Sequence, residues 1–477
     1  MTDVRTRFAP SPTGFIHVGG IRTAQFAWLV ARHSSGQFIL RLEDTDKKRE
    51  VAGAKDHILK SLKTLGLNYD EGPDVGGDLG PYIQSERLDI YRKWADKLIE
   101  LGRAYTDPYS EEELNSLRLE AQKNKKPFLF RNHRPNKLNE IQDNKPIRFL
   151  SQTKSYTWED AVMGHMSFSE SSIDDFILIK SDGYPTYNFA HIIDDIEMKI
   201  THVIRGQEYL PSIPNYLNLY EALAQSPPIF ATLPHVLSET GQKKLSKRDG
   251  AKDILDYINQ GYLPEALLSF IATLGWNDGT TQEVFTTKEL IQKFNLSRVQ
   301  RSGAQFDENR LKWINGVFIR KIEIEKLYEL CENYWPKEAE DYPREYKLKV
   351  LKIIQERMKY LSELPELSQF MFIDLPVNLE LLNLGKLKDV SSQDKISLLQ
   401  KSKDILSQSN FNLDDLNSKL NNLLSDTNQT PAVLFSLIRV ATTQVVSSPA
   451  LGETLEVLGK EKTLKRIDRQ IESLNKN

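Results

Sequence analysis

The sequence contains very little cysteine, with Cys331 as the one thiol in 477 residues. A single cysteine excludes an internal disulfide and a cysteine-based zinc site, and it favours a reducing compartment. Long hydrophobic runs are also missing, because no apolar segment approaches the roughly 18 residues that a membrane helix needs. The N-terminus lacks the pattern of a signal peptide, so we expect a cytoplasmic protein with no membrane partner.

An excess of charge of either sign is missing as well. The chain has 63 Lys and Arg residues against 66 Asp and Glu residues, which gives a formal net charge of −3. Strongly basic domains are the usual sign of nucleic-acid binding, so any contact with RNA must come from local patches. Hydrophobic residues form 39% and charged residues 27% of the chain. This balance excludes disorder as the main state.

Strand-like and helix-like patterns alternate at the start of the chain. Strands are expected at residues 4–9 and 37–42, and helices at residues 21–32 and 52–65. Such an alternation favours an α/β fold with a parallel sheet.

The pattern changes twice further along the chain. Strands expected at residues 177–180 and 200–205 indicate that the α/β pattern resumes after an insertion, and from about residue 323 apolar residues repeat at helical spacing. At roughly 150 residues per domain, the length fits about three domains. We predict a split α/β domain at 1–82 and 184–241, an α+β insertion at 83–183, a linking region at 242–322 and a helical region at 323–477.

A glycine-rich segment, APSPTGFIHVGG, runs from Ala9 to Gly20 between the first expected strand and helix. Its glycines let a ligand approach the backbone, and the free amides of the following helix favour an anion. Gly14 and Gly19 have Walker A spacing, but Gly20 stands where that loop has its lysine. A phosphate-binding lysine must therefore come from elsewhere. Taken alone, the segment fits a plain strand-to-helix turn equally well.

A basic loop between Gly241 and Gly250 offers such a lysine, since it contains three lysines and an arginine. A loop of this kind is able to close over a triphosphate and stabilise its charge. By itself, a charge run of this size is more often a solvated basic turn.

Two polar segments follow expected strands, where ligands bind in open α/β sheets. In the stretch from Arg41 to Asp46, carboxylates can hold an ammonium group or a metal ion, or form an acidic surface turn. Tyr187 and His191 share a face if a helix begins at Tyr187. Arg205 ends the next expected strand and can hold a carboxylate bidentately. The alternatives are a satisfied interior histidine for His191 and a structural ion pair for Arg205.

The insertion contains a basic and aromatic stretch between Arg118 and Arg134. Its members are Lys123, Lys125, Lys126, Phe128, Phe130, Arg131 and His133. This mixture suits a single-stranded RNA end through phosphate contacts and base stacking. A solvated flexible hairpin would show the same composition.

Together and in this order, these motifs resemble the bacterial glutamyl-tRNA synthetases, a family of class I aminoacyl-tRNA synthetases. His17-Val18-Gly19-Gly20 resembles the family's HIGH element, and Lys244-Leu245-Ser246-Lys247-Arg248 resembles its KMSKS loop. The resemblance extends over nearly the whole chain. It implies a Rossmann-type catalytic domain, an insertion for the tRNA acceptor end, a stem-contact region after the KMSKS loop and an all-α anticodon-binding region.

The resemblance also implies a two-step reaction. The α-carboxylate of L-glutamate attacks the α-phosphate of ATP, which is bound with Mg²⁺, to give glutamyl-adenylate and pyrophosphate. The terminal ribose hydroxyl of the glutamate tRNA then takes the glutamyl group and AMP leaves. In this family the first step characteristically needs bound tRNA.

Residue roles follow from the same resemblance. The implied catalytic residues are His17, Lys244 and Lys247. The implied ATP-binding residues are His17, Gly19, Gly20, Glu208, Tyr209 and Lys247. The implied glutamate-binding residues are Arg7, Ser11, Glu43, Tyr187, His191 and Arg205, with the two arginines on the side-chain carboxylate and Glu43 on the ammonium group. The implied tRNA-binding residues are Asp44, Lys125, Lys126, Arg131, Arg357 and Arg439.

The chain departs from the family in three places. Gly20 replaces the last histidine of the HIGH element, and His191 stands where some relatives have a smaller amide. Many relatives bind zinc through cysteines of the insertion, but this insertion has none, so we predict no structural zinc and no bound metal of its own. The family is commonly monomeric, and we expect a monomer.

Other functions remain open from the sequence. A glutaminyl-tRNA synthetase would usually end in β-barrels, and a tRNA-modifying paralogue would lack the C-terminal region. A catalytically silent tRNA-binding paralogue is disfavoured by His17, Lys244 and Lys247. A small-substrate adenylyltransferase leaves the basic insertion and the helical region unexplained. Whether the glutamine tRNA is also charged is not decided by these motifs.

Overall fold

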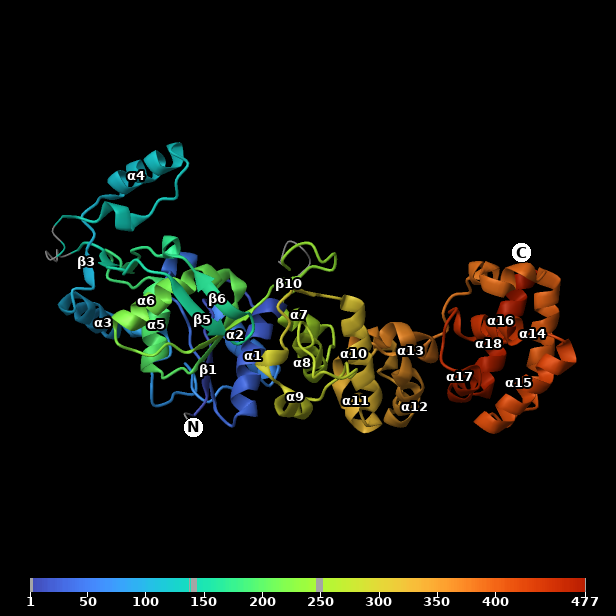
Figure 1. Cartoon of the computed structure of the whole chain (residues 1–477). Helices are drawn as coiled ribbons and strands as arrows, with labels where there is room; N and C mark the ends of the chain where they lie inside the picture. The colour runs from blue at the N-terminus through green and yellow to red at the C-terminus, as the bar shows by residue number, and fades with distance from the viewer. Residues whose placement is uncertain (1–2, 137, 139–143, 246–251, 477) are drawn as a thin grey trace. The chain divides into compact units, whose positions relative to one another are not determined.

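A computed structural model describes residues 3–136, 138, 144–245 and 252–476. The chain divides into two compact units (Figure 1). Unit 1 consists of Met1–Asn259 with Pro264–Leu311, and unit 2 of Gln260–Leu263 with Lys312–Asn477. Lys247 lies outside the described residues, so its role remains a prediction from the sequence.

Unit 1 is built on a four-stranded parallel sheet in the order β2–β1–β8–β9. The strands are β1 (Arg5–Phe8), β2 (Gln37–Leu40), β8 (His202–Gly206) and β9 (Ile229–Leu233). The predicted parallel α/β sheet is thereby confirmed. Because β1 and β8 are neighbours, the residues that end these distant strands meet at one edge of the sheet.

Helix α1 (Val18–His33) connects β1 to β2 and begins in the glycine-rich segment. The Gly19 backbone N–H donates to Nδ1 of His17 at 3.0 Å, so this histidine caps the helix. At the other end, Gly36 closes the connection to β2. A Cβ on Gly36 would lie 2.1 Å from the carbonyl oxygen of Val4, so only glycine fits.

The insertion is an α+β segment, as predicted. It contains a three-stranded antiparallel sheet, β3–β4–β7, and a hairpin, β5–β6 (Figure 1). Its elements are α3 (Leu88–Glu100), β3 (Ala104–Thr106), α4 (Glu111–Lys123), β4 (Ile147–Phe149), β5 (Tyr156–Asp160), β6 (Gly164–Phe168) and β7 (Ile177–Ile179). The strand expected at 177–180 is therefore present, but it pairs antiparallel with β4.

Three further helices of unit 1 come after β2, β7 and β8. They are α2 (Ala54–Thr64), α5 (Tyr187–Glu197) and α6 (Ile213–Ala222). Helix α5 begins at Tyr187, which confirms the predicted shared face of Tyr187 and His191. Buried residues of α3, the insertion sheet, α5 and α6 form one hydrophobic core with β2 and β8, so this core fixes α5 against the sheet.

The rest of unit 1 follows β9. Strand β10 (Val236–Leu237) pairs parallel with β11 (Ala304–Gln305). The helices here are α7 (Ile254–Asn259), α8 (Pro264–Ala272) and α9 (Thr287–Lys293). The turn from β9 to β10 brings Pro234, His235 and the start of the basic loop close to α1.

Unit 2 is helical throughout its described residues, which confirms the predicted helical region. Helix α10 (Glu308–Lys321) leads into it, and the later helices are α11 (Ile324–Leu330), α12 (Arg344–Ile354), α13 (Leu364–Phe372), α14 (Ser392–Ser407), α15 (Leu413–Thr427), α16 (Pro431–Thr443), α17 (Leu451–Leu458) and α18 (Lys460–Asn475). One core lies mainly among α11–α13 and a second among α14–α18. Across the described residues, no helix has the length and apolarity to cross a membrane.

Candidate functional site

A cavity of about 1010 Å³ opens at the edge of the sheet where β1 and β8 end. Its wall also includes the glycine-rich segment, the first turns of α1 and the β9–β10 turn. It brings together the predicted residues Arg7, Ser11, His17, Gly19, Gly20, Glu43, Tyr187, Arg205, Glu208, Tyr209 and Lys244. The other predicted residues of unit 1 that the structure describes are outside this lining, namely Asp44, Lys125, Lys126, Arg131 and His191.

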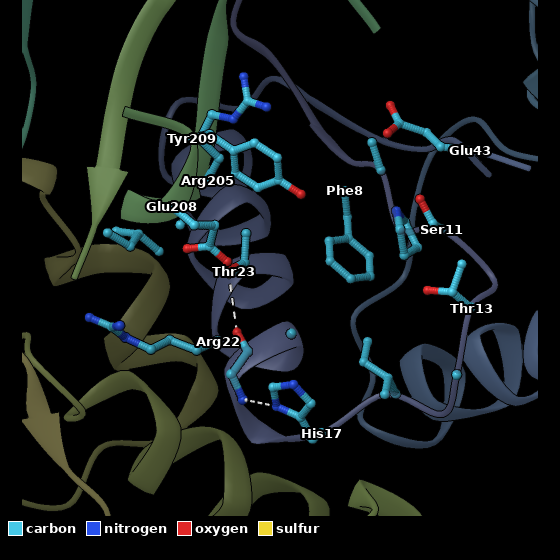
Figure 2. A pocket seen from close by; sticks show the side chains of 18 of the residues that line it. Phe8, Ser11, Thr13, His17, Arg22, Thr23, Glu43, Arg205, Glu208 and Tyr209 are labelled. Carbon is cyan, nitrogen blue, oxygen red and sulfur yellow. Dashed lines mark hydrogen bonds between the residues drawn. The ribbon is translucent and has the colours of Figure 1, made fainter. Parts of the chain in front are cut away.

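The cavity has two halves. Figure 2 shows Arg205, Glu208 and Tyr209 on one side and Ser11 with Glu43 on the other. His17 lies at the N-terminus of α1, below both groups in the same view. The helix N-terminus therefore presents its positive end to the cavity, where it favours a negatively charged group.

Arg205 is buried at the end of β8 and has unusual partners. Its Nη2 donates to the Tyr187 hydroxyl at 2.7 Å, and its Cζ lies 4.2 Å from the centre of the Tyr209 ring. In the described part of the chain no carboxylate is within ion-pair distance of this guanidinium, and Nε has no hydrogen-bond partner. A buried guanidinium whose partners are all neutral can bind an anionic ligand.

Arg7, the second predicted carboxylate-binding arginine, is differently placed. Its Nε donates to Oδ1 of Asp195 at 3.1 Å, and Arg41 donates to the same oxygen at 2.8 Å. Although burial raises the pKa of Asp195, the two guanidinium groups lower it to about 2. The charge of Arg7 is therefore already compensated inside the protein.

Glu43 belongs to the same buried network. Arg41 donates to Oε1 of Glu43 at 2.9 Å, and both side chains are buried. Burial raises the pKa of Glu43 above its ordinary value, in spite of the opposing effect of Arg41. The network thus holds one carboxylate at a fixed place in the wall opposite Arg205.

His191 lies directly behind Arg205. Its Nδ1 is 2.7 Å from the carbonyl oxygen of Tyr187, and its Nε2 is 3.4 Å from Nη1 of Arg205. The ring is buried and its pKa lies well below the ordinary value, because of burial first and the charge of Arg205 second. His191 is consequently neutral. It does not line the cavity itself but contacts Arg205, which does.

Lys244, at the start of the basic loop, lines the cavity beside Glu208. Its Nζ donates to Oε1 of Glu208 at 3.1 Å, and Nδ1 of His235 lies 3.7 Å from the other carboxylate oxygen. The side chains of Lys244 and Glu208 are about half exposed. An exposed pair of this kind is weak, so a polyphosphate can replace Glu208 as the partner of Lys244.

The predicted tRNA-binding residues are spread over both units. Asp44 accepts hydrogen bonds from the backbone N–H of Ser85 at 2.8 Å and from its hydroxyl at 2.6 Å. Lys125 and Lys126 are exposed in the turn after α4. Arg131 donates to the backbone carbonyl of Ile173 at 2.7 Å, so its guanidinium is already used inside the insertion.

The two predicted arginines of unit 2 converge on one turn. Nη1 of Arg357 donates to the Ser448 carbonyl at 3.0 Å, and Nε of Arg439 donates to the Ser448 hydroxyl at 2.9 Å. Burial and the neighbouring charge of Arg357 lower the pKa of Arg439. Two cations held this close form a local positive patch without an acidic partner in the described residues.

The sequence analysis did not identify Arg22, which also lines the cavity. Its Nη1 donates to the carbonyl of Pro234 at 2.6 Å, and burial lowers its pKa to about 10. Nε and Nη2 have no partner among the described residues. The available signal was an arginine within the apolar helix that follows the glycine-rich segment.

Metal ligands are not gathered in the described residues, where no three His, Cys, Asp or Glu side chains form a cluster. The absence of structural zinc remains a prediction from the sequence. Oxygen-rich phosphates are themselves good Mg²⁺ ligands, so a nucleotide can bring its metal ion with it.

Family comparisons cover both units. A model described as "tRNA synthetases class I (E and Q), catalytic domain" matches residues 3–313, and one described as "Anticodon binding domain" matches residues 326–471. A glutamate–tRNA ligase of Clostridium botulinum is 41% identical and one of Clostridium tetani is 39% identical. Each alignment covers 99% of this chain and 98% of the relative.

Solved structures agree in fold. The crystal structure of a glutamate tRNA ligase from Elizabethkingia meningosepticum, in complex with its amino acid, matches with a TM-score of 0.89 and 32% identity. The match covers 99% of this chain and all of that one. A glutamate-tRNA synthetase from Elizabethkingia anophelis matches with a TM-score of 0.87 and 31% identity.

Proposed function

The chain belongs to the glutamate–tRNA ligases, which are class I aminoacyl-tRNA synthetases, and from this premise we propose how its own residues carry out the reaction. The protein is an enzyme that joins glutamate to tRNA, with ATP as the energy source. The roles of individual residues in the cavity are the proposal.

Arg205 is the residue that selects the amino acid, and its lack of a carboxylate partner among the described residues is the observation that carries the proposal. The γ-carboxylate of glutamate supplies the missing negative charge. Glutamine cannot do so, because its amide would leave the buried guanidinium uncompensated. Arg7 lines the same cavity and supports this binding, but Asp195 compensates most of its charge.

Glu43 and Ser11 orient the other end of the amino acid. Both line the wall opposite Arg205, as Figure 2 shows. Glu43 is fixed by Arg41 and attracts the α-ammonium group. With the side chain at Arg205 and the ammonium at Glu43, the α-carboxylate is left to react.

ATP with Mg²⁺ occupies the half of the cavity next to α1. Gly19 and Gly20 allow the nucleotide to approach the helix N-terminus, and Glu208 and Tyr209 also line the cavity. Nδ1 of His17 accepts the Gly19 N–H, so Nε2 is the ring nitrogen that we assign as a donor to a phosphate. Arg22 adds a buried positive charge beside Pro234.

The chemistry requires no nucleophile from the protein. An α-carboxylate oxygen of glutamate attacks the α-phosphorus, the bond to the β-phosphate oxygen breaks, and pyrophosphate leaves with the electron pair. Positive groups held in place stabilise the charge that develops on the phosphates. Lys244 and, by the sequence, Lys247 supply these positive groups, and His17 supplies a hydrogen-bond donor. The tRNA ribose hydroxyl then attacks the acyl carbon, and AMP leaves.

The tRNA is bound by both units in this proposal. Lys125, Lys126 and Arg131 belong to the insertion, and Asp44 lies beside the cavity. Arg357 and Arg439 of unit 2 form the positive patch near Ser448. A cytoplasmic location and a monomeric state complete the proposal, and the former fits a chain with one cysteine.

ATP–pyrophosphate exchange tests the proposed function directly. The enzyme is incubated with L-glutamate, Mg²⁺ and labelled pyrophosphate, with and without total tRNA, and L-glutamine replaces glutamate in a parallel series. We expect exchange with glutamate and tRNA together, and little with glutamine. No exchange under any condition, with folded protein, would favour a catalytically silent tRNA-binding paralogue.

A further inference from the structure

His191 is held so that only one of its ring nitrogens carries a proton. Nδ1 lies 2.7 Å from the backbone carbonyl oxygen of Tyr187, which can only accept a hydrogen bond. The proton is therefore on Nδ1, and Nε2 keeps its lone pair. Arg205, which can only donate, lies on that side, with Nη1 at 3.4 Å. The geometry of both neighbours thus selects the same tautomer.

The ring is also fixed in orientation. It stacks on Tyr187, with ring centres 4.8 Å apart, and meets Tyr216 edge to face at 4.6 Å. His191 is only 2% exposed, so solvent does not compete for Nε2. Its depressed pKa agrees with a permanently neutral ring. Nε2 is consequently a rigid, uncharged acceptor behind Arg205.

All partners of Arg205 share this neutrality. Nη2 donates to the Tyr187 hydroxyl, Nη1 donates to His191, and the rings of Tyr209 and Tyr216 face the guanidinium at 4.2 and 5.3 Å. Aromatic faces and neutral acceptors orient a cation without cancelling its charge. Arg205 lines the cavity, so its terminal N–H groups that face the cavity can donate to a ligand. By contrast, Arg7 forms an ion pair with Asp195, which compensates the positive charge of Arg7.

We infer that His191 is a positioning residue, which as a neutral Nδ1–H tautomer orients Arg205 and keeps its full charge available for the side-chain carboxylate of the substrate. His191 itself does not line the cavity. This inference deepens the proposed function, since it rests on Arg205 as the residue that selects glutamate. It assigns glutamate specificity partly to a side chain that does not touch the substrate.

The test compares two substitutions of His191 in the whole enzyme. His191→Phe keeps a flat ring between Tyr187 and Tyr216 but removes the acceptor. His191→Gln removes the ring but can place an amide oxygen near the former position of Nε2. His202→Phe is the matched control, because His202 is a partly buried histidine at the start of the same strand as Arg205, bonded to Thr201 and outside the cavity.

Binding of L-glutamate is measured by calorimetry without nucleotide, and KM values for glutamate and ATP are measured by exchange in the presence of tRNA. We expect His191→Phe to weaken glutamate binding about tenfold, as for the loss of one hydrogen bond to a charged group, with the KM for ATP within about twofold of wild type. We expect His191→Gln to restore most of the affinity and His202→Phe to behave as wild type. The preference for glutamate over glutamine falls only in His191→Phe.

Ring tautomers provide an independent readout in the unmodified protein. The chain has eight histidines, so the ¹⁵N signals of His191 are assigned by their loss in His191→Gln. We expect the shifts of a neutral ring protonated on Nδ1. A ring protonated on Nε2, or normal glutamate affinity in His191→Phe, would overturn the inference. Equal weakening in His191→Phe and His191→Gln would assign the effect to packing instead and overturn it as well. If wild-type enzyme binds glutamate but shows no exchange, the proposed reaction fails while this test still stands.

Discussion

Arg205 and Arg7 line the same cavity but have different partners. The partners of Arg205 are neutral, whereas Arg7 shares Asp195 with Arg41. Residue type alone is therefore a poor guide to which cation binds an anion. The decisive property is whether the protein has already compensated the charge.

Replacing Arg205 by alanine tests this distinction. We expect Arg205→Ala to raise the KM for glutamate about a hundredfold, because the γ-carboxylate would enter a buried site without its cation. The KM for ATP should stay within about twofold. Pyrophosphate exchange with tRNA measures both. Arg32→Ala on α1 is the control, since Arg32 pairs with Asp70 outside the cavity. An unchanged KM for glutamate in Arg205→Ala would remove Arg205 from the glutamate pocket.

The pKa of Asp195 gives a prediction about acid stability. Its pKa is about 2 in the folded protein and 3.8 ordinarily, so the folded state binds this proton less readily than the unfolded state. The corresponding stabilisation is present above about pH 4 and is lost as the pH falls toward 2.

We therefore compare wild type with Asp195→Asn by urea unfolding. At pH 7 the variant should be less stable by about 3 kcal/mol, because Arg7 and Arg41 lose a buried counter-charge. At pH 3 the gap between the two proteins should be smaller. A gap that is constant from pH 7 to pH 3 would show that Asp195 does not stabilise the fold through its charge.

At the scale of elements, the glycine between α1 and β2 sets how closely the helix returns to the sheet. Gln37 donates its backbone N–H to the Val4 carbonyl at 2.8 Å, immediately after Gly36. A methyl group at Gly36 would collide with that same carbonyl. This return joins the end of α1 to the start of β2 beside β1.

We expect Gly36→Ala to lower the free energy of unfolding by about 3 kcal/mol, since backbone must move to relieve the collision. Chemical unfolding measures the loss. Ser34→Ala, two residues earlier in the same connection, is the control and should change stability by less than about 0.5 kcal/mol. Wild-type stability of Gly36→Ala would mean that the connection tolerates a side chain.

Much of the element order was predictable from local patterns. Residues 4–9 and 37–42 contain β1 and β2, and residues 200–205 contain all of β8 but Gly206, because short apolar alternation bounded by turns is a local property. The partner of a strand is not local, which is why β7 was predicted as a strand within residues 83–183 but its antiparallel pairing with β4 was not.

The site was predictable to the same extent and for the same reason. Motifs such as the glycine-rich segment identify wall residues, and the cavity contains most of those that the resemblance implied. The pairing of Arg7 and Arg41 with Asp195 joins residues far apart in sequence. No local pattern states which charges will be compensated, so the contrast between Arg205 and Arg7 required the fold.

At the scale of the whole molecule, chemistry and stability are distributed between two units with cores of their own. All residues that line the cavity belong to unit 1. The core of α14–α18 lies entirely within unit 2 and includes Leu437, which is fully buried. Amino-acid binding should therefore depend on unit 1 alone, whereas charging of tRNA should require both units.

Leu437→Ala tests whether amino-acid binding and the charging of tRNA depend differently on unit 2. The cavity it creates should lower the stability of unit 2 by about 3 kcal/mol, and Leu384→Ala, at a half-exposed leucine of the same unit, is the control. Because the glutamate site has no residue from unit 2, we expect glutamate affinity measured by calorimetry to stay within about twofold of wild type. The kcat/KM for tRNA should fall as unit 2 loosens near its melting temperature. A loss of glutamate affinity in Leu437→Ala would show that glutamate binding depends on the folding of unit 2. It would contradict the expectation that glutamate binding depends on unit 1 alone.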